Sequence, residues 1–123
     1  MPGMRGLTII VTSADPSCFH AALSIAAANA ATDAPTRVYL HADAVALAAP
    51  PHVCPDDARY AAAGLPTLAQ LVEECGAMGV RLIACQTGLA LASLDAEALG
   101  PDIEAGGLVG LLSSLGDDRL VTI

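Results

Sequence analysis

The chain has 123 residues, of which 54% are hydrophobic, and a formal net charge of −8 with only five basic residues. This length predicts a single domain over residues 1–123 with a full hydrophobic core. All five basic residues are arginines spread along the chain. Nucleic-acid binding, which needs clustered contacts to phosphate, is therefore not expected.

The sequence predicts no membrane partner. No apolar run reaches the roughly 18 residues of a membrane-spanning helix, and residues 1–5 lead directly into a strand too short for a signal-peptide core. We therefore expect a cytoplasmic protein. In that compartment its four cysteines are expected to be thiols rather than disulfides.

In the first half of the chain the apolar pattern alternates between strands and helices. Residues 7–12 form a β-branched strand, residues 15–31 form a helix with Asp as N-cap and Pro at its first position, and residues 36–41 form a second strand. Residues 43–48 suit a short helix. Residues 49–65 are rich in proline and are expected to be an irregular loop with a functional or mobile role.

The second half continues the same alternation. The expected elements are a helix from Thr67 to about Gly76, a strand over 80–84, a short helix around 89–93, a brief strand over 103–105, a helix over 108–115 and a last strand over 119–123. Apolar strands alternating with amphipathic helices predict an α/β fold with a parallel sheet covered on both faces.

Cys85 is the strongest candidate for chemistry. It ends the apolar run of the third predicted strand, and Gln86, Thr87 and Gly88 follow at once. Functional sites of parallel sheets gather at the carboxyl ends of strands, and the N–H groups of a helix start stabilise a thiolate. We expect Cys85 to be a nucleophile, with Gln86 and Thr87 supplying donors and Gly88 permitting a close backbone approach. The alternative is a small residue that fills the strand end.

The other cysteines and histidines rank below Cys85. Cys18, Cys54 and His41 fall at the same predicted edge of the sheet and are possible neighbours of Cys85, whereas Cys75 lies on a core-facing helical stripe and is expected to be a packed thiol. A metal site built from the histidine and cysteine side chains at this edge would lack the tight Cys-x-x-Cys spacing that structural metal sites show. No metal is therefore expected.

The chain lacks the residues that three other functions of this architecture require. A receiver domain needs an acidic cluster after the first strand and a lysine near the last, and the chain has only Asp15 there and no lysine. A flavodoxin needs a glycine-containing phosphate loop and aromatic residues beside the flavin, and a thioredoxin-type protein needs Cys-x-x-Cys. None of these patterns is present, and no cofactor is expected.

Residues 79–87, Gly-Val-Arg-Leu-Ile-Ala-Cys-Gln-Thr, resemble the DsrE/DsrF-like sulfur-relay family, as do residues 94–99, residues 102–107 and the final helix and strand. The resemblance implies a three-layer α/β/α sandwich with a mostly parallel sheet of about five strands, of flavodoxin-like or DsrE-like topology, assembled as trimers or hexamers. Characterised members carry sulfur as a cysteine persulfide, and their acceptor cysteine corresponds to Cys85. The chain departs from the pattern because no second motif cysteine lies near Cys85 and residues 49–65 cannot be aligned.

The leading hypothesis is therefore a sulfur-relay protein, a possible sulfurtransferase, that accepts sulfane sulfur on Cys85 from a donor protein and passes it to an acceptor protein. One alternative is a non-catalytic subunit that uses the fold to build a homo-oligomer. The other is a thiol redox sensor in which Cys85 pairs with Cys18 or Cys54.

Overall fold

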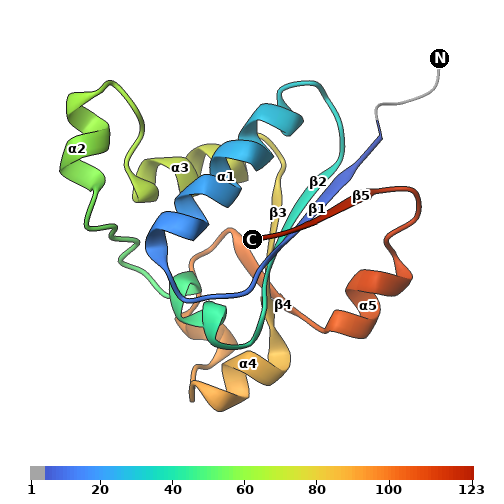
Figure 1. Ribbon diagram of the computed structural model, residues 1–123. Coiled ribbons are helices and arrows are strands. Elements are labelled where there is room, and N and C mark those ends of the chain that lie inside the picture. Colours follow the sequence, from blue (N-terminus) through green and yellow to red (C-terminus); the bar gives the residue numbers. More distant parts are fainter. Residues whose placement is uncertain (1–4) are drawn as a thin grey trace.

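The apolar runs of the sequence form a five-stranded sheet with helices on both faces in a computed structural model that describes residues 5–123 (Figure 1). The elements are β1 (Leu7–Val11), α1 (Pro16–Ala30), β2 (Thr36–Leu40), the 3-10 helix η1 (Ala42–Ala48), α2 (Asp57–Ala62), α3 (Leu68–Ala77), β3 (Arg81–Cys85), α4 (Gln86–Leu91), the 3-10 helix η2 (Ala96–Ala98), β4 (Ile103–Gly106), α5 (Leu108–Ser113) and β5 (Arg119–Thr122).

The strands are all parallel and lie in the order β4-β3-β2-β1-β5. The predicted α/β fold with a parallel sheet is therefore confirmed. The order differs from the 2-1-3-4-5 order of flavodoxins, so flavodoxin-like describes the layers and not the strand order. β1 and β2 lie inside the sheet and all of their residues are buried, whereas β5 is an edge strand whose residues are all exposed.

The helices form a layer on each side of the sheet. α1 and α3 pack together over one face, and α5 lies on the other (Figure 1). α1 begins as predicted: the Asp15 carboxylate accepts a hydrogen bond of 2.8 Å from the Ser17 N–H, and Pro16 takes the first helical position. α3 begins with a capping box between Thr67 and Gln70. Both caps fix where a helix starts over the sheet.

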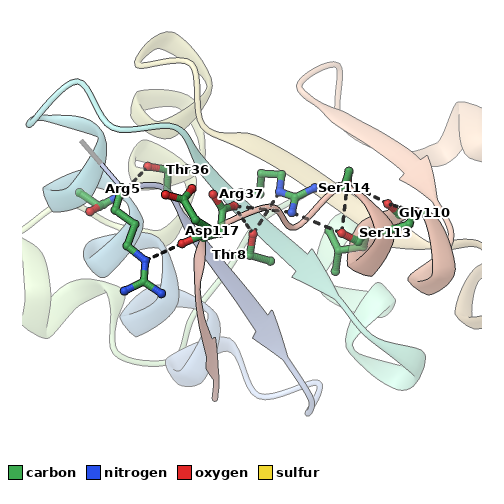
Figure 2. A network of polar contacts seen from close by, with 11 residues as sticks. Arg5, Thr8, Thr36, Arg37, Gly110, Ser113, Ser114 and Asp117 are labelled. Atoms are coloured by element: carbon green, nitrogen blue, oxygen red, sulfur yellow. Dashed lines mark hydrogen bonds and ion pairs between the residues drawn. The ribbon is translucent and has the colours of Figure 1, made fainter. Parts of the chain in front are cut away.

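Arg37 attaches α5 and β5 to the sheet near the amino ends of the strands. Its buried guanidinium donates to the hydroxyls of Thr8 at 3.1 Å and Ser114 at 2.8 Å, and it forms an ion pair of 3.6 Å with Asp118 (Figure 2). The Thr8 hydroxyl in turn donates to Asp118 at 2.8 Å. Buried charges are tolerated when they are paired and hydrogen-bonded in this way. The network therefore has a structural role, at the opposite end of β2 from His41.

The segment 49–65 is more ordered than the sequence predicts, because it contains α2. The Asp57 carboxylate accepts hydrogen bonds from the N–H groups of Cys54 at 3.0 Å and Leu68 at 2.9 Å. These two bonds hold the pKa of Asp57 below its ordinary value. They also tie the segment to the first residue of α3, so the prediction of an irregular loop over its whole length was wrong.

Two helix boundaries also differ from the prediction. Gly76 lies inside α3, which ends at Ala77. α4 starts directly after Cys85 and not near Leu89, since the sulfur of Cys85 itself accepts a bond from the Gly88 N–H and caps the helix.

The prediction that the N-terminus holds no signal peptide rests in part on residues 1–4, which lie outside the described residues. Within residues 5–123, none of the helices combines the length and the apolar character needed to cross a membrane.

Candidate functional site

Cys85 lies at the carboxyl end of β3, beside the end of β2. The parallel register pairs Tyr39 with Ile83 and Leu40 with Ala84. Because side chains alternate along a strand, Tyr39, Ile83 and Cys85 share one face of the sheet. That face is the one covered by α5, since Arg37, two residues before Tyr39, donates to the carbonyl oxygen of Leu111.

The sulfur of Cys85 is surrounded by hydrogen-bond donors. The Gly88 N–H donates to it at 3.4 Å. Burial raises the pKa of Cys85, but the neighbouring Tyr39 hydroxyl and the backbone N–H groups of Ala42, Gly88 and Thr87 lower it by more. The net pKa of Cys85 is therefore lowered below that of an ordinary thiol. This arrangement favours the thiolate, which is the nucleophilic form of cysteine.

The main chain of Ala42 is held against α4. Ala42 has a φ of 51°, in the left-handed region that L-residues other than glycine rarely adopt. A Cβ atom on Gly88 would lie 2.4 Å from the Ala42 carbonyl oxygen and 2.8 Å from Cγ1 of Val45. Only glycine leaves room for this approach, which brings the N–H groups of Ala42 and Gly88 near the same sulfur. Backbone strain of this kind concentrates at functional sites.

Tyr39 and His41 supply the two buried side-chain polar atoms that have no hydrogen-bond partner within the part of the chain that the structure describes. These atoms are the Tyr39 hydroxyl and Nδ1 of His41, and the two rings are stacked with centroids 6.3 Å apart. His41 and Cys85 both follow directly on the Leu40–Ala84 pair, so their main chains are neighbours at the sheet edge. Burial, and then the neighbouring Cys85, raise the pKa of Tyr39.

Tyr39 is not identified by the sequence pattern alone. Its signal is an aromatic residue two positions before the end of the neighbouring strand, in a chain with only one other tyrosine. That signal becomes readable only once the register of β2 against β3 is known.

The side chains of Gln86 and Thr87 are exposed, and Thr87 acts on Cys85 through its backbone N–H rather than through its hydroxyl. Gln86 lies beside Gly107, the residue between β4 and α5, because a Cβ atom there would lie 3.7 Å from the Oε1 of Gln86. The three residues after Cys85 thus contribute two N–H groups, a close backbone approach and one exposed amide.

The other cysteines have separate surroundings. The Cys18 thiol contacts the Asp15 carboxylate at 3.7 Å, and the buried Cys54 sulfur lies 3.8 Å from the Ser17 hydroxyl. No hydrogen bond among residues 5–123 joins either cysteine to Cys85, and all four cysteines are free thiols. Cys75 is fully buried, as its helical stripe predicts, and burial raises its pKa to about 11.

Access to Cys85 is narrow in the single chain, because only 5% of the residue is exposed. A cavity of about 230 Å³ opens on the same face, lined by Ile83, by the glycines at the end of β4 and by residues of α5. Gly106, which pairs with Cys85, lines this cavity. Within the described residues no group of three or more His, Cys, Asp or Glu side chains is arranged to hold a metal ion.

Comparisons with known proteins agree with this fold. The model of the DsrE/DsrF-like family matches residues 6–123. Two similar solved structures are the ychN protein from E. coli, with a TM-score of 0.74 and 19% identity, and MTH1491 from Methanobacterium thermoautotrophicum, a protein of unknown function, with a TM-score of 0.71 and 15% identity. Each alignment covers 98% of this chain and 100% of the other. A comparison with curated proteins finds no match.

Proposed function

Because the chain belongs to the DsrE/DsrF-like family, we propose that it is a sulfur-relay protein that carries sulfane sulfur as a persulfide on Cys85. Family membership suggests a role in sulfur relay in general. The observation that supports Cys85 as the carrier is the position of its sulfur at the start of α4, where it accepts a hydrogen bond from the Gly88 N–H and where neighbouring donors lower its pKa against the effect of burial.

The proposed reaction conserves atoms and electrons. The Cys85 thiolate attacks the outer sulfur of a donor persulfide, a bond forms between Sγ of Cys85 and that sulfur, and the donor's S–S bond breaks to release the donor as a thiolate. The persulfide on Cys85 then passes its outer sulfur to an acceptor thiolate by the same exchange. Neither step needs an external oxidant, a metal or a cofactor.

A lowered pKa serves both steps. It increases the fraction of Cys85 that is thiolate at neutral pH, and it makes Cys85 a better leaving group when the sulfur is passed on. The Gly88 N–H already donates to the sulfur, and the N–H groups of Ala42 and Thr87 also lower its pKa, so the charge meets donors that are in place before the reaction. Gln86, exposed beside Gly107, is placed to contact the outer sulfur or the incoming protein.

The partners we propose are a donor protein and an acceptor protein, each with a reactive thiol, in the cytoplasm, where such thiols stay reduced. We also propose that copies of the chain assemble as a homo-oligomer, a trimer or a hexamer. The support is a group of exposed apolar residues on α5 and the edge strand β5, namely Val109, Leu112, Leu120 and Val121, with Val109 83% exposed. Apolar edge strands are normally covered.

One observation favours the alternative of a non-catalytic oligomeric subunit, namely the 5% exposure of Cys85. Mass spectrometry separates the two functions. The reduced protein is incubated with a persulfide donor, and its mass is measured beside those of Cys85→Ser and, as a matched control, Cys18→Ser. The sulfur-relay function predicts a gain of one sulfur atom that Cys18→Ser keeps and Cys85→Ser loses. Equal uptake by Cys85→Ser refutes it.

A further inference from the structure

We propose that the Tyr39 hydroxyl is a dedicated hydrogen-bond donor to the reacting sulfur of Cys85, and that it sets how readily this cysteine ionises. This inference deepens the proposed function, since it names the side chain that prepares the carrier cysteine. It concerns the state of the sulfur before any donor or acceptor arrives.

The Tyr39 hydroxyl is buried without a partner. Tyr39 is fully buried, and its hydroxyl has no hydrogen-bond partner among residues 5–123. A buried phenol that lacks a partner costs free energy, so such groups are rare in cores made of Ala, Leu, Val and Ile. Phenylalanine would fill the same space without that cost. The hydroxyl is therefore explained by a neighbour that needs a donor.

Tyr39 and Cys85 are also neighbours in the sheet. They lie on the same face of adjacent strands, with Cys85 two residues beyond the residue that pairs with Tyr39. The His41 ring stacks on the Tyr39 ring, with centroids 6.3 Å apart. Each of the two groups, Tyr39 and Cys85, shifts the pKa of the other.

The Cys85 thiol ionises before the Tyr39 phenol. The pKa of Tyr39 is raised, by burial first and by Cys85 second, whereas the pKa of Cys85 is lowered. The thiol therefore loses its proton first, and the Tyr39 hydroxyl is still a donor when the sulfur becomes an anion. Tyr39 acts as a donor and not as a base.

Other titratable groups lie on the elements around Cys85 and have to be separated from Tyr39. They are Arg37 on β2, His41 between β2 and η1, Asp43 on η1, Arg81 on β3 and Glu104 on β4, while α4 carries none. Asp43 is exposed, and Glu104 is paired with Arg81. Among them, His41 is the group whose Nδ1 is also buried without an aligned partner, so its variant is the required control.

The test is the pH dependence of alkylation of Cys85 in a protein that lacks the other three cysteines, compared among Tyr39→Phe, Tyr60→Phe and His41→Gln. Loss of one hydrogen bond to a thiolate raises its pKa by about one unit. At neutral pH the thiolate fraction then falls about tenfold while its nucleophilicity rises about threefold, so alkylation slows about threefold. At high pH, where the thiol is fully ionised in both proteins, Tyr39→Phe reacts about threefold faster.

The inference is supported if the pH–rate profile of Tyr39→Phe crosses that of the parent protein and the profiles of the other two variants do not. A merely structural change would not raise the rate at high pH. Profiles of Tyr39→Phe that coincide with the parent protein, or an equal shift in Tyr60→Phe or His41→Gln, overturn it. Alkylation needs no sulfur donor. If sulfur uptake fails and the Tyr39→Phe profile is shifted, the proposed function is rejected and this inference stands. If sulfur uptake succeeds and the profile is not shifted, the inference is rejected and the proposed function stands.

A second measurement keeps the inference testable if Tyr39→Phe does not fold. The chain has two tyrosines, so in Tyr60→Phe the biosynthetic incorporation of fluorotyrosine modifies Tyr39 alone. A fluorinated phenol is a stronger donor, and the pKa of Cys85 is expected to fall where Tyr39→Phe raises it. An unchanged pKa of Cys85 in the fluorinated protein contradicts the inference.

Discussion

Replacement of Gly88 by alanine tests whether the close approach of η1 and α4 is what prepares Cys85. The new Cβ atom would lie 2.4 Å from the carbonyl oxygen of Ala42, 3.0 Å from its carbonyl carbon and 2.8 Å from Cγ1 of Val45. The nearest of these is a backbone atom that cannot rotate away as a side chain can. Either Ala42 or the first turn of α4 must therefore move, by roughly 1 Å to reach an ordinary contact.

The magnitude follows from two effects. Overpacking a buried site costs about 1–3 kcal/mol of stability. The same movement draws the N–H groups of Ala42 and Gly88 away from the Cys85 sulfur, to which the Gly88 N–H now donates at 3.4 Å. Weakening one such bond is worth about 1.4 kcal/mol, or about one pH unit. The pKa of Cys85 should then rise toward that of an ordinary thiol.

The assay combines urea denaturation with the pH profile of Cys85 alkylation. Gly110→Ala is the matched control, because a Cβ atom on Gly110 meets nothing within 4 Å and the residue lies in α5. We expect Gly88→Ala to lose stability and to shift the profile upward while Gly110→Ala does neither. A Gly88→Ala protein with unchanged stability and an unchanged profile would refute the argument that this approach organises the site.

Three further predictions concern stability and pH. Ala42→Gly removes the strain of a left-handed backbone conformation, which costs an alanine about 1–2 kcal/mol. Because the extra freedom of glycine in the unfolded chain costs about 0.5–1 kcal/mol, chemical denaturation should show a net gain in stability of about 0.5–1 kcal/mol. A loss of stability would contradict the presence of strain at Ala42. Cys75 has a raised pKa, so its contribution to stability is intact below about pH 9 and is lost as pH rises through about 11. Over that window alkaline denaturation curves should show that the parent protein loses about 2–3 kcal/mol more than Cys75→Ala does, and equal losses would contradict this account. Arg37→Met leaves Asp118 without its ion pair, so urea denaturation should show a loss of about 3 kcal/mol in the free energy of unfolding. The pH profile of Cys85 alkylation should not change. A shifted profile would show that the network around Arg37 is coupled to Cys85.

The sequence predicts the strands and their class because the apolar runs are short, β-branched and separated by clear helix caps. Asp15 with Pro16, and Thr67 with Gln70, mark helix starts that the structure keeps. Cys85 at a strand end follows from the same reading, since an apolar run stops there. Local chemistry of this kind is visible within a window of a few residues.

The surroundings of Cys85 could not be predicted in the same way, because they depend on register between distant segments. Tyr39 becomes a neighbour of Cys85 only through the pairing of β2 with β3. Ala42 contributes its N–H from a left-handed turn that no residue preference would suggest for alanine. The order in residues 49–65 likewise comes from Asp57, whose two backbone partners are 3 and 11 residues away.

The central claim, that Cys85 takes up one sulfur atom and gives it back, is tested most directly in a protein that retains Cys85 and lacks Cys18, Cys54 and Cys75. The protein is treated with a persulfide donor, freed of the donor and then given an acceptor thiol, and the peptide that contains Cys85 is followed by mass spectrometry. We predict that this peptide gains one sulfur atom with the donor and loses it to the acceptor. A Cys85 peptide that never gains the sulfur would contradict the account.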